Sequence, residues 1–203
     1  MENREELIER AFRLEWITAG WMVVEAAVAI GSGVAARSLT LIAFGADSVI
    51  ELLSACLLLW RLHVELRERE NFSEATERTA GRAGAALLVA LSLYVVASAA
   101  WSLWRRTGQE FSTLGLALAL LAIPIMAVLA TAKRRLAEAI GSAALRADAI
   151  ESVACLYLSC VVVIGLLAQW AIGAWWIDGV SALVLTPFLI KEAHEAWADD
   201  AED

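Results

Sequence analysis

Six apolar stretches divide the chain, and each is close to the ~20 residues that a helix needs to cross the hydrocarbon core of a bilayer. They cover residues 14–36, 39–60, 84–104, 113–132, 148–169 and 172–190. A helix suits lipid because it satisfies its backbone hydrogen bonds within one segment. With 60% hydrophobic residues in a chain of 203, little sequence is left for a large soluble domain. We therefore expect an all-α polytopic membrane protein, with one transmembrane domain over residues 1–203.

The Lys and Arg residues lie mostly on one of the two sides that six crossings define. All but three of the 16 fall in the N-terminus, the 61–83 and 133–147 connections and the tail; the exceptions are Arg37, Arg105 and Arg106. Cytoplasmic loops of membrane proteins carry the excess of positive residues. We therefore expect both termini to be cytoplasmic, and we take the plasma (inner) membrane as the default location.

Charge and cysteine usage exclude several classes of function. The formal net charge is −8, and no basic stripe is present that would neutralise phosphates, so we expect no nucleic-acid partner. The acidic N-terminus lacks the features of a cleaved signal peptide, so the first apolar stretch should remain as a helix. The three cysteines form no CxxC pair, which makes an enzyme such as a membrane thiol oxidoreductase the least expected function.

Two carboxylates stand inside the second apolar stretch, where a charged side chain costs about 2.5–3.5 kcal/mol on insertion scales. On a helix, Asp47 and Glu51 lie about 40° apart, and Ser54 lies about 20° from Asp47 on its other side. The three residues therefore form one polar stripe. Such a stripe either binds a cation or joins helices by hydrogen bonds, which is the structural alternative.

A second stripe lies at the start of the fifth stretch, where Asp148, Glu151 and Cys155 fall within about 60° of one another. If the second and fifth helices lie side by side, Asp47, Glu51, Glu151 and Cys155 meet near mid-membrane. Three carboxylates and a thiol need protons or a cation to neutralise them, and a thiolate favours zinc or a neighbouring soft metal. Protons and metal would then compete for one site.

Three segments resemble the cation diffusion facilitators, a family of divalent metal transporters with a six-helix membrane domain. RSLTLIAFGADSVIELLS is similar to the second helix of the family, SAALRADAIESVAC to the start of the fifth, and WWIDGVSALVLTPFLIKEAHEA to the sixth. The resemblance implies that the transported metal binds to Asp47, Glu51, Glu151 and Cys155, with Asp148 in a supporting role.

The chain departs from the family pattern in three places. The pair on the fifth helix is usually His or Asp with Asp, whereas here it is Glu151 with Cys155, and no histidine lies in any of the six stretches. Gly179 stands where Pro is usual. The chain ends soon after the sixth stretch, so we expect no C-terminal soluble domain that binds metal and dimerises. A homodimer would then form through the membrane helices.

These observations predict an antiporter that exports a divalent metal, most simply Zn²⁺, against an inward flow of protons by alternating access. Cd²⁺, Co²⁺, Fe²⁺ and Mn²⁺ stay open as cargo, and we expect no resident cofactor. Asp148, Ser54 and Glu25 are candidates for support or for a proton path, and Glu25 is left open between that role and pairing with a neighbour. The alternative function is a non-transporting membrane subunit whose acidic stripes pair with a partner protein.

Overall fold

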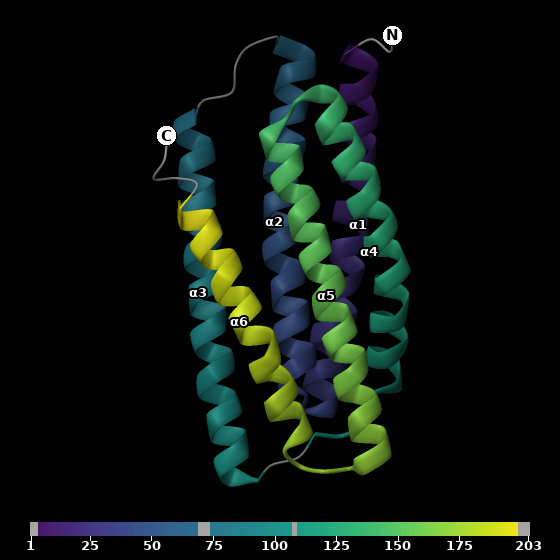
Figure 1. Ribbon diagram of the computed structural model, residues 1–203, viewed down its shortest axis with the longest axis vertical. Helices are drawn as coiled ribbons and strands as arrows, with labels where there is room; N and C mark the ends of the chain where they lie inside the picture. The colour runs from purple at the N-terminus through teal and green to yellow at the C-terminus, as the bar shows by residue number, and fades with distance from the viewer. Residues whose placement is uncertain (1–3, 69–73, 107–108, 199–203) are drawn as a thin grey trace.

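The structure, a computed structural model, describes residues 4–68, 74–106 and 109–198, and every regular element in these ranges is an α-helix. The helices are α1 (Arg4–Ala36), α2 (Leu39–Glu68), α3 (Glu74–Arg105), α4 (Thr113–Ile140), α5 (Ala143–Ile172) and α6 (Ile177–Ala198). All six run along the long axis of one bundle, and both chain termini lie toward the same end (Figure 1). The expected all-α, six-helix fold is confirmed.

The helices pack as a group of four with a pair beside it. In the group, α1 packs on α2 and α4, and α4 packs on α5, while α3 and α6 pack against each other at one side of the bundle (Figure 1). Helix α2 is the centre of this arrangement because it also contacts α3, α5 and α6. The two helices with acidic stripes, α2 and α5, are therefore neighbours, as the sequence predicted.

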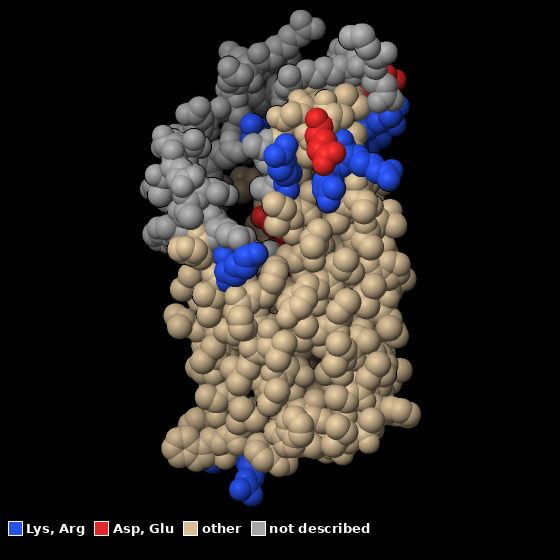
Figure 2. Space-filling view, viewed as in Figure 1, with Lys and Arg blue, Asp and Glu red and all other residues tan. Residues whose placement is uncertain are grey.

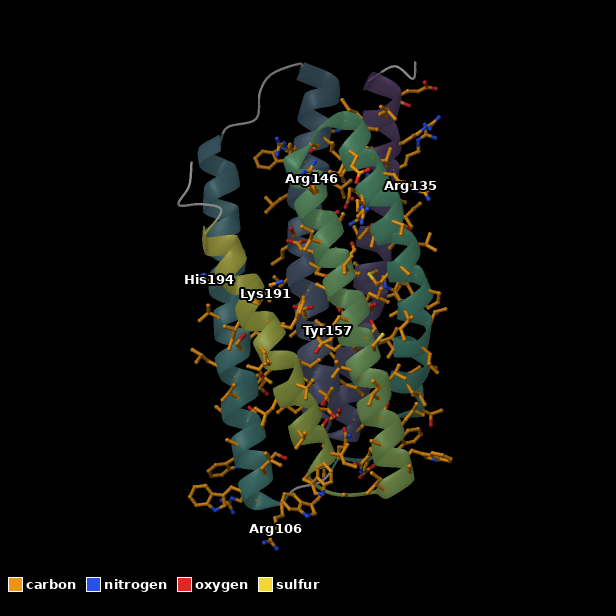
Figure 3. All side chains as sticks on the ribbon, viewed as in Figure 1. Arg106, Arg135, Arg146, Tyr157, Lys191 and His194 are labelled. Carbon is orange, nitrogen blue, oxygen red and sulfur yellow. The ribbon has the colours of Figure 1, made fainter. Side chains whose placement is uncertain are left out.

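The surface matches a chain that lies in a bilayer. Four helical segments are long and apolar enough to span one: Glu6–Ala36, Leu39–His63, Thr113–Ile140 and Asp148–Ile172, with a shorter apolar helix at Val89–Arg105. Figure 2 shows a wide band of uncharged surface, with charged side chains gathered near the end that carries the termini. Arg135 and Arg146 lie near that end and Arg106 lies at the opposite one (Figure 3). Which end faces the cytoplasm stays a prediction.

Short turns fix where the helices that carry the stripes begin. Helix α4 ends at Ile140 and is capped by Gly141, whose φ of 75° is left-handed. The side chain of Ser142 then accepts a hydrogen bond from the backbone N–H of Leu145 to cap α5. This turn sets the start of α5 a few residues before Asp148. Glycine suits the turn because it has no Cβ to clash in the left-handed region.

A close approach of α1 and α2 brings the first stripe against the first helix. A Cβ atom added to Gly45 would lie only 2.7 Å from Cγ1 of Ile30 and 2.9 Å from Cβ of Ala29. The missing side chain therefore lets the two helices touch by their backbones, as small residues do in membrane bundles. Asp47 follows two residues later and is turned into the interior, where only 2% of its surface is exposed.

Candidate metal site

The two acidic stripes meet through a hydrogen bond between α2 and α5. The Ser54 hydroxyl donates to Oε1 of Glu151 at 3.2 Å. The other oxygen of that carboxylate, Oε2, is buried and has no hydrogen-bond partner among the described residues. A buried carboxylate oxygen without a partner is costly in a medium of low dielectric constant. Glu151 therefore has one oxygen held by α2 and one that remains available to a cation.

Asp47 lies near this carboxylate and faces the same interior region. Its charge interacts with those of Glu151 on α5 and Glu25 on α1. Glu51, one turn further along α2, is half-buried, and its charge acts on Cys155. These interactions indicate that Asp47 lies near Glu151 and that Glu51 lies near Cys155.

Glu25 completes this region from the first helix. Its Oε1 accepts hydrogen bonds from the Ser48 hydroxyl at 2.8 Å and from Sγ of Cys155 at 3.1 Å. Its Oε2 accepts a hydrogen bond from the Trp21 indole at 2.7 Å. Glu25 and Cys155 are both fully buried. The structure thus gives Glu25 three neighbours as partners, and one of them is an expected ligand.

The four expected ligands do not surround a common point. Within the described part of the chain, no group of three or more His, Cys, Asp or Glu side chains is arranged so that it could hold a metal ion. Ser54 occupies one oxygen of Glu151, and Cys155 is turned toward Glu25. Assignment of the ligands to Asp47, Glu51, Glu151 and Cys155 stays a prediction.

Asp148, expected to support the site, has a partner that the sequence analysis missed. Its Oδ2 lies 2.5 Å from the ammonium group of Lys133 on α4, and that ammonium group lies 3.4 Å from Oε1 of Glu15 on α1. The sequence predicts Lys133 in the connection over 133–147, but the structure places it inside α4 and fully buried, because the helix continues to Ile140. Glu15 lies near the start of the first apolar stretch. Nothing in their spacing links them, because they come from different helices.

Comparison with known proteins assigns most of the chain to a protein family. The model of a family described as the cation efflux transmembrane domain matches residues 16–200, which is most of the chain. No curated protein matches it. The matched region contains the two acidic stripes, Glu25 and all of α2 through α5.

Proposed function

The chain belongs to the cation efflux family and is a divalent cation transporter of that kind, and we propose that its cargo is Zn²⁺, which it exports in exchange for protons. The family match favours this function over the alternative of a non-transporting subunit. A homodimer formed through the membrane helices and a location in the plasma membrane are part of the same proposal.

The contact between Ser54 and Glu151 is the observation that carries this proposal. It brings the two acidic stripes face to face, and it leaves Oε2 of Glu151 buried without a hydrogen-bond partner among the described residues. A divalent cation would stabilise the carboxylates of Asp47, Glu51 and Glu151 because each loses its water on burial. Carboxylate oxygens with one thiolate form a mixed set that suits Zn²⁺ and Cd²⁺.

Cys155 supports the exchange of metal for protons. Sγ of Cys155 lies 3.1 Å from Oε1 of Glu25, a distance at which a protonated thiol donates a hydrogen bond to a carboxylate. A metal ion binds the thiolate, which means that this proton must leave when the metal enters. Carboxylates at the same site follow the same rule. The site therefore holds either metal or protons, and this competition couples the two flows.

Zinc flux into liposomes containing the purified protein tests the proposed exchange. Zn²⁺ added outside should enter, and the lumen should become more alkaline because each ion that enters drives protons out. An acid-loaded lumen should accelerate zinc entry. Zinc entry without any pH change would contradict proton exchange while leaving transport intact. No entry of Zn²⁺, Cd²⁺, Co²⁺, Fe²⁺ or Mn²⁺ above that into empty liposomes would contradict transport itself.

Substitution of Cys155 by Asp tests the choice of metal. A carboxylate is a harder ligand than a thiolate, so C155D should keep transport but lose about tenfold of its preference for Zn²⁺ and Cd²⁺ over Mn²⁺. Competition between these ions for uptake measures the preference. Cys160→Ser provides a matched control because Cys160 lies on the same helix and is only half-buried. An unaltered preference in C155D would mean that Cys155 is not a ligand.

A further inference from the structure

Three ionisable side chains from three helices form a buried ion triad, which consists of Glu15 on α1, Lys133 on α4 and Asp148 on α5. Glu15 and Lys133 are fully buried, and Asp148 is 6% exposed. The single ammonium group lies between the two carboxylates, 2.5 Å from Asp148 and 3.4 Å from Glu15. A buried ion pair is often no more stabilising than an apolar contact of the same volume. Stability alone therefore gives little reason for a chain to place three charges here.

The ion triad lies between an apolar plug and the candidate metal site. The plug is a cluster of buried side chains at the end of the bundle that carries the termini, formed by Ile8, Ala11, Leu58, Leu62, Ala137 and Leu145. One turn deeper along α5, about 4.5 Å from Asp148 at 1.5 Å per residue, stands Glu151. An ion that moves between that end and Glu151 along α5 therefore passes the ion triad.

The charge of Lys133 reaches the expected ligands as well as its partners in the ion triad. It acts on Glu51 of α2 and on Glu151 of α5. Its ammonium group contacts Glu15 and Asp148 at the distances of ion pairs. The flexible four-carbon stem of Lys133 allows this ammonium group to shift.

We propose that Lys133 is a tethered cation that competes with the transported metal for the carboxylates on the terminal side of the site. Its single positive charge offsets one of the two negative charges of Asp148 and Glu15 while no metal is near, and it repels a divalent ion bound at Glu151, which helps that ion to leave. Lys133 is in this sense a positioning residue rather than a ligand. The inference rests on the proposed function, because it requires that metal binds near Glu151.

The dissociation constant of Zn²⁺ for the purified protein, measured by titration calorimetry, tests this role. Lys133→Met keeps the length of the side chain and removes its charge, so K133M should bind Zn²⁺ at least about tenfold more tightly than the wild type. In liposomes, the KM for zinc and the maximal rate should both fall, since binding is favoured and release is slowed. Lys133→Arg retains the charge and should stay close to the wild type. A dissociation constant in K133M that is unchanged or larger would overturn the proposal.

A second variant covers the case in which K133M does not fold. Lys133→Met combined with Glu15→Gln removes one charge of each sign, so the net charge of the ion triad is unchanged. Asp148 is then the one charged member of the ion triad, and it has lost its cation. This variant should also bind Zn²⁺ more tightly than the wild type, and equal or weaker binding would count against the proposal. Arg134→Met is the matched control, because Arg134 is the next residue on α4 and is exposed in a surface pair with Glu138.

Different results contradict the proposed function and the role of Lys133. If the wild type binds no divalent metal, the proposed function is wrong. If the wild type binds zinc but K133M and the double variant do not bind it more tightly, only the role of Lys133 is wrong. A purely structural role for the ion triad would lower the amount of folded protein or its thermal stability without tightening zinc binding.

Discussion

Replacement of Glu151 by Gln should reduce zinc transport to the level of empty liposomes. The amide keeps the shape of the side chain and can still accept the hydrogen bond from Ser54, but it removes the negative charge at the buried Oε2. Loss of a partner that only orients a ligand costs about 10–100-fold in metal affinity, so loss of a charged ligand should cost at least about 100-fold. Zinc binding to the purified variant and zinc flux in liposomes measure the two effects.

A matched control separates the site from a general effect of charge. Glu138→Gln is the same substitution on α4, at an exposed side chain that pairs with Arg134 at 3.3 Å. It should leave transport unchanged. Asp47→Asn should behave like E151Q, because Asp47 is buried and its charge interacts with that of Glu151. Transport at the wild-type rate in both E151Q and D47N would mean that the metal does not bind between α2 and α5.

Replacement of Asp178 by Ala should destabilise the whole bundle. The carboxylate of Asp178, in the first turn of α6, caps the start of α2: it accepts hydrogen bonds from the Ser38 hydroxyl at 2.8 Å, the Leu39 N–H at 2.7 Å and the Thr40 N–H at 3.1 Å. Each buried donor that loses its partner costs about 1–3 kcal/mol. The total of about 3 kcal/mol or more corresponds to a fall in Tm of about 6–12 °C for a chain of this size.

The stability of D178A is measured by thermal unfolding of the protein in detergent. Asp178→Asn keeps one oxygen acceptor and should lose less stability than D178A. Ser112→Ala is a matched control, because Ser112 caps α4 by a single hydrogen bond from Gly115 and should cost only about 1 kcal/mol. If D178A melts within the range of the Ser112 variant, the three hydrogen bonds do not hold α2 and α6 together.

Much of the fold follows from local features of the sequence. The structure forms a helix over each apolar stretch, except that the sixth, expected over 172–190, begins as a helix only at Ile177 because residues 173–176 form the turn after α5. The structure also extends some helices beyond the stretches: α1 begins at Arg4 and α2 continues to Glu68. Hydropathy marks where a helix meets lipid, whereas a helix ends where its backbone loses its hydrogen bonds, so the two boundaries differ.

Part of the candidate site was also accessible from the sequence. The fixed rotation of about 100° per residue places Asp47, Glu51 and Ser54 on one face of α2, and Glu151 and Cys155 on one face of α5. The hydrogen bond from Ser54 to Glu151 confirms that these faces meet. Glu25 was left open because a single carboxylate on a helix has no stripe to show which way it points. Its contacts with Ser48 and Cys155 appear only when α1 is packed in place.

The sequence by itself determined the helices, their polar faces and the type of chemistry that three carboxylates and a thiol can perform. These properties depend on residues within a few positions of one another, which the geometry of one helix relates. The tertiary structure alone decided that Lys133 lies between Glu15 and Asp148, and that Asp178 caps α2. These partners are separated by up to 140 positions along the chain. Their contacts depend on which helix faces meet across the bundle, and the pattern within a single helix carries no information about that.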